Sequence, residues 1–140
     1  MIVNTDADNQ YDASYIPALV RPIVENEADM VIGARPINRI KHFSPIKKLL
    51  QNLGSAAVRW ASSTDVKDAP SGFRAMRLPE ALQLNVYNNY TYTIETIIQA
   101  GRRGFRIQNV DVQVNEDLRP SRLVRSIPTY VRRNMLTILR

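Results

Sequence analysis

The sequence predicts an α/β protein, because stretches typical of strands alternate along the chain with stretches typical of helices. Short apolar runs occur near the start of the chain, around residue 31 and around residue 110. Between them lie longer segments in which apolar residues recur every three or four positions, the period of an amphipathic helix. At 140 residues the chain is expected to form one domain with a modest core.

The first elements follow from this alternation. Residues 2–5 are predicted to form a buried strand, and residues 29–34 a second short strand. Residues 14–26 between them are predicted to be helical, with Pro17 in the first turn, where its missing N–H costs little.

A second helix is predicted to begin at Ser44 and Pro45, because a capping residue followed by proline is a strong helix start. Apolar residues recur at helical spacing after it, and we expect their face to lie in the core. These residues are Ile46, Leu49, Leu50, Leu53 and Ala57. The polar residues of the segment are expected to point elsewhere.

The second half of the chain continues the pattern. Residues 73–77 are predicted to be a strand, residues 78–80 the start of a short helix, residues 93–102 a helix that Gly104 ends, and residues 105–114 a strand. A last amphipathic helix is predicted to begin near Ser126.

The net charge of +6 is concentrated at the end of the chain. Residues 118–140 hold six Arg and no carboxylate, whereas acidic and basic side chains balance in residues 1–117. Such a block suits anionic lipid, a phosphorylated substrate or a solvated helix face. Nucleic acid is disfavoured, because no binding module is recognisable and few aromatic residues lie among the arginines to stack on bases.

The absence of cysteine excludes disulfides and thiolate metal sites and fits a reducing compartment. No apolar run reaches the roughly 18 residues that a membrane-spanning helix needs, and no signal peptide is recognisable. The expectation is a soluble or peripheral cytoplasmic chain.

Two carboxylates, Asp6 and Asp8, stand two residues apart at the end of the first predicted strand. Residues at this spacing in a strand face the same side, so both can converge on one cation. Oxygen ligands of this kind suit Mg²⁺ or Mn²⁺. The alternative is an ordinary acidic pair on a solvated loop.

Four segments in this order resemble the family 2 glycosyltransferases, and most closely their dolichol-phosphate or polyprenyl-phosphate hexosyltransferases. They are Asp6-Ala-Asp8-Asn-Gln10, Val31-Ile-Gly-Ala-Arg35, Asp68 with Ser71-Gly72-Phe73-Arg74, and Arg119-Pro-Ser121-Arg122-Leu123. The resemblance implies the C-terminal half of a GT-A fold, a mixed sheet with flanking helices. Residues 1–117 would be its catalytic and acceptor half, and residues 118–140 a basic loop and amphipathic C-terminal helix. The nucleotide-binding N-terminal half of the family would be missing.

The resemblance also assigns roles at the donor side. Asp6 and Asp8 would hold Mg²⁺ or Mn²⁺ against the diphosphate of a nucleotide sugar. The donor-binding residues would be Gln10, Arg119, Ser121 and Arg122. Asp68 would be the catalytic carboxylate: a general base for a hydroxyl acceptor, or an orienting group for a phosphate acceptor, which is already ionised. Capping of the Pro-Ser-Gly turn by Asp68 is the structural alternative.

The acceptor side would be cationic. Arg35, Lys47, Lys48 and Arg74 are the predicted acceptor-phosphate residues, since guanidinium groups bind phosphate oxygens in pairs. Arg74 has a second interpretation as a strand-edge charge. Gln51 or Asn52 stands where related lipid-phosphate enzymes have serine.

The implied activity is inverting hexosyl transfer from a nucleotide sugar to a polyprenyl or dolichyl phosphate, by a peripheral protein at the cytoplasmic face of an anionic membrane. One alternative is transfer to a sugar or polysaccharide hydroxyl. Another is a truncated noncatalytic module that binds lipid or a partner. The sequence leaves the nucleotide, the sugar and the oligomeric state open.

Overall fold

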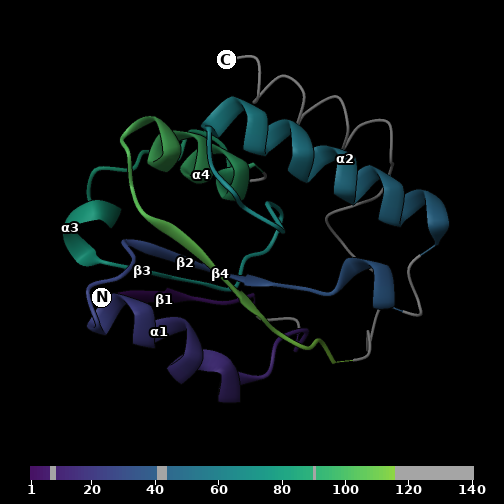
Figure 1. The fold of residues 1–140 in the computed structure, drawn as a ribbon, viewed down its shortest axis with the longest axis horizontal. Coiled ribbons are helices and arrows are strands. Elements are labelled where there is room, and N and C mark those ends of the chain that lie inside the picture. Colours follow the sequence, from purple (N-terminus) through teal and green to yellow (C-terminus); the bar gives the residue numbers. More distant parts are fainter. Residues whose placement is uncertain (7–8, 41–43, 90, 116–140) are drawn as a thin grey trace.

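A computed structural model of the chain describes residues 1–6, 9–40, 44–89 and 91–115. Within these residues the protein is α/β, with one open sheet and helices on both of its faces (Figure 1). The predicted fold class is confirmed at that level. The predicted loop and helix of 118–140, with Arg119, Ser121 and Arg122, lie outside the described residues, as does Asp8.

The sheet formed by the described residues is mixed and has four strands in the order β1-β3-β2-β4. Strand β3 runs antiparallel to both of its neighbours, β1 and β2, whereas β4 runs parallel to β2. The strands are β1 (Ile2–Asn4), β2 (Met30–Ala34), β3 (Arg74–Met76) and β4 (Ile107–Asp111). Arg74 is opposite Asn4 on one side and Ile32 on the other, which fixes the register.

Strand β2 is buried along its whole length, because helices cover both faces of the sheet at its centre. This explains its uninterrupted apolar sequence. Strand β1 was predicted to be buried as well, and that prediction is wrong. It is an edge strand that pairs with β3, and Ile2 and Val3 remain 39% and 38% exposed.

One face of the sheet is covered by α1 (Ile16–Val24), which follows the short 3-10 helix η1 (Ala13–Tyr15). Asp12 caps η1 by accepting a hydrogen bond from the backbone N–H of Ser14 at 2.8 Å. The buried side chains of α1 pack with those that point from the sheet toward it. This cluster includes Leu19, Ile23, Val31, Phe73, Ala75 and Val112.

The other face is covered by α2 (Pro45–Ser62) and α4 (Tyr92–Arg102), which pack against each other (Figure 1). Ser44 caps α2 by accepting a hydrogen bond from the backbone N–H of Lys47, as predicted. The chain turns out of α4 at Gly104, whose φ of 71° favours glycine. The core on this side includes Met30, Ile32, Val58, Ile94, Ile97 and Ala100.

The predicted orientation of α2 is wrong. Its apolar stripe faces outward, with Ile46 64%, Leu49 59% and Leu53 57% exposed. The buried residues of α2 are Ser55, Val58 and Ser62. The physical reason is that a surface of small side chains lets α2 lie close to α4, where Gly101 approaches the carbonyl oxygen of Ser62.

The remaining elements are the 3-10 helix η2 (Ile37–Arg39) and the short helix α3 (Leu78–Ala81). Among the helices of the described residues, none combines the length and the apolar character needed to cross a membrane.

Candidate functional site

The candidate site lies at the edge of the sheet where β1 and β2 end and β3 begins. Because β3 is antiparallel to both neighbours, its first residue, Arg74, pairs with Asn4 at the end of β1 and with Ile32 near the end of β2. The loop before β3, residues 68–73, therefore meets Asp6 after β1 and Arg35 after β2. Crevices at the carboxyl ends of strands are the usual ligand sites of open α/β sheets.

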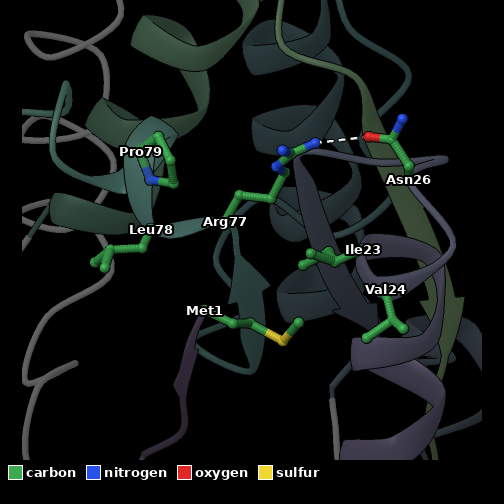
Figure 2. Close-up of a pocket in the computed structure, with 7 residues that line it drawn as sticks. All are labelled: Met1, Ile23, Val24, Asn26, Arg77, Leu78 and Pro79. Carbon is green, nitrogen blue, oxygen red and sulfur yellow. Dashed lines mark hydrogen bonds between the residues drawn. The ribbon is translucent and has the colours of Figure 1, made fainter.

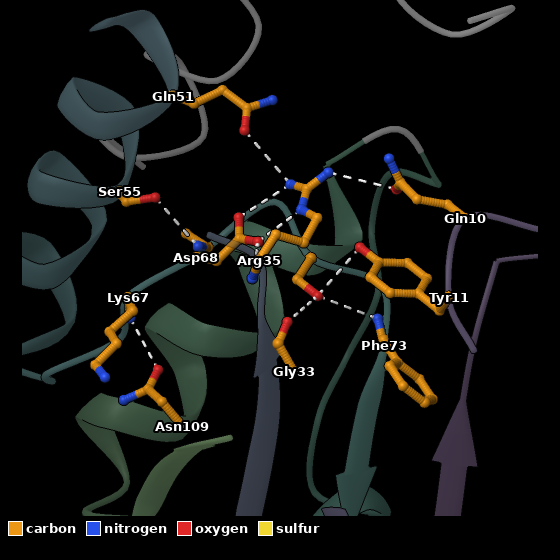
Figure 3. Close-up of polar contacts among 12 residues, drawn as sticks. Gln10, Tyr11, Gly33, Arg35, Gln51, Ser55, Lys67, Asp68, Phe73 and Asn109 are labelled. Carbon is orange, nitrogen blue, oxygen red and sulfur yellow. Dashed lines mark hydrogen bonds and ion pairs between the residues drawn. The ribbon is translucent and has the colours of Figure 1, made fainter. Parts of the chain in front are cut away.

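Asp68 and Arg35 form a buried ion pair at this edge (Figure 3). Nε of Arg35 donates to Oδ2 of Asp68 at 2.7 Å, and Nη2 donates to Oδ1 at 3.0 Å. The backbone N–H of Arg35 donates to the same Oδ2 at 3.1 Å. Only 1% of the Asp68 side chain and 7% of the Arg35 side chain are exposed. Both carboxylate oxygens are thus engaged by one guanidinium, the geometry of a strong charge-assisted pair.

Two amides complete the surroundings of the Arg35 guanidinium. Its Nη1 lies 3.4 Å from Oε1 of Gln10, and its Nη2 lies 3.5 Å from Oε1 of Gln51 on α2 (Figure 3). The structure therefore brings together Gln10, which was predicted to bind the donor, Arg35, which was predicted to bind the acceptor phosphate, and Gln51. Gln51 was considered only as a replacement for serine.

Asp6 lies against Gly72. A Cβ added at Gly72 would stand 2.5 Å from Oδ2 and 2.6 Å from Oδ1 of Asp6, so a side chain larger than hydrogen would displace the carboxylate. Gly72 is therefore a point at which the backbone closely approaches the Asp6 carboxylate. The Asp6 residue as a whole is exposed to solvent.

Asn4 and Tyr92 flank this carboxylate and were missed by the sequence analysis. Nδ2 of Asn4 donates to the carbonyl oxygen of Gly72 at 2.9 Å and lies 3.3 Å from the hydroxyl of Tyr92. Burial, together with the negative charge of Asp6, raises the pKa of Tyr92. The phenol thus stays neutral, and its hydrogen bond to Asp6 adds to the shift. A tyrosine at the first position of a helix carries no recognisable sequence signal for such a role.

Tyr11 and Ser71 hold the loop before β3 onto the end of β2. Oγ of Ser71 donates to the carbonyl oxygen of Gly33 at 2.6 Å and accepts from the backbone N–H of Phe73 at 3.3 Å. Since its only proton is used on Gly33, the Tyr11 hydroxyl 3.3 Å away is the donor of the Tyr11–Ser71 bond. Burial raises the pKa of Tyr11 to about 12. The position of Asp68 depends on this loop.

Arg74 has a different place from the predicted one. It is 1% exposed and points into the protein, where it donates to the carbonyl oxygens of Ser71, Ala69 and Thr93 and to Oγ1 of Thr96. Burial lowers the pKa of Arg74 to about 10, so the guanidinium remains charged at neutral pH. We correct its role from phosphate ligand to the residue that ties the 68–73 loop to α4.

The two predicted lysines lie in the first turn of α2. Nζ of Lys48 donates to the carbonyl oxygen of Asn38 at 3.0 Å, which directs its charge toward η2 and away from the ion pair. Lys47 is half-buried. The residue of α2 that reaches Arg35 is Gln51, one turn further on.

Of the two predicted metal ligands, Asp6 and Asp8, the described residues include only Asp6. No group of three or more His, Asp or Glu side chains gathers in the part of the chain that the structure describes. Exposed carboxylate oxygen is nevertheless the donor chemistry that Mg²⁺ and Mn²⁺ prefer, with phosphate and water completing the shell. Asp6 therefore supplies one ligand of the kind that such an ion takes, and phosphate and water would have to supply most of the others.

A separate open cavity of about 470 Å³ lies at the opposite end of β1 and β3 (Figure 2). It is lined by Met1, Ile23, Val24, Asn26, Arg77, Leu78 and Pro79, and Nη1 of Arg77 donates to Oδ1 of Asn26 across it. Its lining holds no carboxylate and none of the predicted site residues. We place the candidate site at the Asp6–Arg35–Asp68 edge because the carboxylates and the predicted site residues lie there, although the cavity lies elsewhere.

The class of protein that these features define is an α/β protein with a mixed open sheet and a polar cluster at the carboxyl ends of β1 and β2. No family model matches the chain. It is similar to an uncharacterized protein, MJ1222, of Methanocaldococcus jannaschii, with 27% identity over 119 residues. That match covers 81% of this chain and 49% of the relative, so the chain spans about half the length of the protein it matches.

Proposed function

We propose that this chain is the metal- and phosphate-binding part of a family 2-like glycosyltransferase with a GT-A fold. The intact enzyme would transfer a hexose from a nucleotide sugar to a polyprenyl or dolichyl phosphate, with inversion. The observation that carries the proposal is the meeting of Asp6, Arg35 and Asp68 at one edge of the sheet, with Gln10 against Arg35. The motifs that resemble the family are far apart in the sequence, and three of them converge here.

Asp6, with Asp8 beyond the described residues, would hold Mg²⁺ or Mn²⁺. The ion would neutralise the charge that develops on the nucleoside diphosphate as it leaves. Two features of the chain support this role for Asp6. Gly72 leaves room for the carboxylate, and the neutral phenol of Tyr92 holds it in place by a hydrogen bond.

Arg35 would bind the acceptor phosphate. Its planar fork is already ordered by Asp68, so little conformational entropy is lost when an oxyanion binds. A phosphate dianion has the same bidentate geometry as the carboxylate and would share or take over the fork.

In this arrangement Asp68 orients Arg35 and does not act as a base. Both of its oxygens are engaged by Arg35, and a phosphate monoester is largely ionised at neutral pH because its second pKa is about 6. An acceptor hydroxyl would instead require Asp68 to leave Arg35 and accept a proton. The buried pair therefore favours the phosphate acceptor over the carbohydrate alternative.

The test is a transfer assay with the longest gene product that contains these residues. Radiolabelled GDP-mannose or UDP-glucose, Mn²⁺, and either polyprenyl phosphate or an oligosaccharide are incubated with it, and products are separated by organic extraction. We expect organic-soluble label, and we expect the Asp68→Asn variant to lose rate equally at all pH values. Label in carbohydrate alone, with an Asp68→Asn loss of about 10² or more and a distorted acid limb, would establish the hydroxyl acceptor. Absence of transfer from any nucleotide sugar would leave the noncatalytic module.

A further inference from the structure

Glu95 ties the turn before α4 to this helix by three hydrogen bonds. Its Oε2 accepts from the backbone N–H of Tyr87 at 2.9 Å and from that of Asn88 at 3.4 Å. Its Oε1 accepts from the hydroxyl of Thr91 at 2.7 Å. Residues 85–89 are exposed, so packing of their own side chains does little to fix this turn. The Glu95 carboxylate supplies the fixed contacts instead.

Thr91 is the point at which these contacts reach the helix. It immediately precedes α4 and is 1% exposed. Its carbonyl oxygen accepts from the backbone N–H groups of Ile94 and Glu95, both at 3.0 Å. A threonine at this position usually caps the helix by accepting a hydrogen bond through its side chain. Here the side chain makes no such bond, and its hydroxyl donates to Glu95. The orientation of the first turn of α4 therefore depends on Glu95.

The first residue of α4 is Tyr92, which reaches the candidate site. Its hydroxyl makes a hydrogen bond to the carboxylate of Asp6. The next residue, Thr93, is held from the side of the sheet, because its carbonyl oxygen accepts from Nη1 of Arg74 at 2.9 Å. Arg74 and Glu95 thus fix the same helical turn from two sides, and this turn presents Tyr92 to Asp6.

We infer that Glu95 is a positioning residue, which holds Tyr92 against Asp6 so that the Asp6 carboxylate keeps one orientation. This role rests on the proposed function, because Asp6 is there the metal ligand. Groups that hold a metal ligand in place contribute to metal affinity although they do not touch the metal. A direct role for Glu95 is disfavoured, since both of its oxygens already accept hydrogen bonds from the protein.

The experiment is a double-mutant cycle of Glu95→Ala and Tyr92→Phe, in which calorimetry measures the affinity of the 140-residue chain for UDP with Mn²⁺. Each single variant should bind about tenfold more weakly than the wild type, the usual loss when the support of a metal ligand is removed. Because Glu95 acts through Tyr92, the double variant should bind no more weakly than either single one. Two independent losses would instead multiply to about a hundredfold.

The variant Glu95→Gln separates positioning from an effect of the negative charge. Its carboxamide oxygen can accept from the backbone N–H groups of Tyr87 and Asn88, while Nε2 donates to the hydroxyl of Thr91. This variant should therefore bind UDP with Mn²⁺ within about twofold of the wild type. If the charge of Glu95 were itself required, Glu95→Gln would bind as weakly as Glu95→Ala.

The matched control is Gln99→Ala. Gln99 lies one turn further along α4 and holds the same exposed segment at its other end. Its Oε1 accepts from the backbone N–H of Asn85 at 3.0 Å, and its Nε2 donates to the carbonyl oxygen of Asn85 at 2.6 Å. Because these bonds lie away from Thr91, Gln99→Ala should leave the affinity for UDP with Mn²⁺ unchanged.

A second cycle, without nucleotide or metal, separates this inference from the proposed function. Urea denaturation compares Glu95→Ala, Asp6→Asn and the double variant. Because Tyr92 links the two residues, their effects on the unfolding equilibrium constant should depart from additivity by about threefold or more. If the wild type binds no UDP with Mn²⁺, the proposed function fails, and this cycle alone decides whether Glu95 acts on Asp6.

Four results would overturn the inference. They are wild-type affinity in Glu95→Ala, multiplied losses in the first cycle, equal losses in Glu95→Gln and Glu95→Ala, and an equal loss in the control Gln99→Ala. Additive effects in the urea cycle would overturn it even if no nucleotide binds. Circular dichroism verifies that each variant folds. If Glu95→Ala does not fold, Thr91→Val replaces it in both cycles, since it removes one of the three bonds and nearly keeps the side-chain shape.

Discussion

At the scale of single residues, the pairing of Arg35 with Asp68 determines how the site can work. A buried guanidinium needs an anionic partner, and the partner here is the Asp68 carboxylate. Its two oxygens accept hydrogen bonds from the guanidinium in the same bidentate geometry that a phosphate would use. The same pair that stabilises the ligand-free protein therefore preorganises a ligand site. The sequence placed both residues in the site but could not show that they are bonded to each other.

We predict that Asp68→Asn lowers the free energy of unfolding by about 3 kcal/mol, because it leaves Arg35 buried without its counter-charge. The control Asp65→Asn, at an exposed position three residues earlier, should change it by less than about 0.5 kcal/mol. Urea denaturation measures both. Added inorganic phosphate should restore more stability to Asp68→Asn than to the wild type, since the anion can replace the lost partner. A variant that is as stable as the wild type would show that the ion pair does not form.

Tyr11 gives a pH-dependent prediction. Its pKa is raised by burial to about 12, above the value of 10.0 in the unfolded chain, so the folded protein holds this proton more tightly. The resulting stability is fully present below about pH 10 and is lost as the pH rises toward about 12. In Tyr11→Phe this loss should disappear, while the lost bond to Ser71 costs about 1 kcal/mol at neutral pH. Denaturation at pH 8, 9, 10 and 11 tests it. A constant difference between wild type and variant over that range would contradict the prediction.

At the scale of elements, α2 shows what a periodic pattern can and cannot predict. The pattern and the Ser44–Pro45 start predicted the helix and its first residue. The pattern also revealed the apolar stripe, but periodicity carries no information on which side of a helix meets the sheet. That choice was made by small residues, because Ser55, Ser62 and Gly101 allow a close approach of α2 and α4 that larger side chains would prevent.

Two helical glycines test this packing with opposite signs. A Cβ at Gly101 of α4 would overlap the carbonyl oxygen of Ser62, so Gly101→Ala should destabilise the protein by about 3 kcal/mol. A Cβ at Gly54 of α2 meets nothing within 4 Å, so Gly54→Ala should stabilise it by about 0.5 to 1 kcal/mol through helix propensity. Thermal denaturation compares the two. Similar effects from both would mean that α2 and α4 are not in close contact.

At the scale of the whole molecule, the two ends of the sheet have different chemistry. At the end away from the site, Asp29 accepts hydrogen bonds from Nε and Nη2 of Arg106 at 3.1 and 2.8 Å. These bonds are the main cause of the lowered pKa of Asp29, and they tie the start of β2 to the start of β4. At the other end, Asp6 is exposed and Gly72 leaves room beside it. An ion pair holds the first end together, and the second is the end to which we assign the candidate site.

The site was predicted in part. Asp6 and Arg35 closely follow strands, Asp68 precedes a Pro-Ser-Gly turn, and Gln10 follows the Asp6–Asp8 motif, all of which sequence patterns can recognise. Tyr92 and Gln51 reach the site from helices whose rotation the sequence did not determine. Arg74 was misjudged because alternation in a short strand does not reveal that a cation will be buried among carbonyl oxygens.

The most direct test of the central claim is calorimetric titration of the 140-residue chain with UDP and with GDP, each with and without Mn²⁺. We predict binding that requires Mn²⁺ and that Asp6→Asn weakens by about tenfold or more, because two carboxylates leave most of the metal shell to phosphate and water. Glu25→Gln, an exposed carboxylate at the end of α1, should bind like the wild type. Identical isotherms for the wild type and Asp6→Asn, or no metal-dependent binding by the wild type, would contradict the assignment of this edge of the sheet as a metal and diphosphate site.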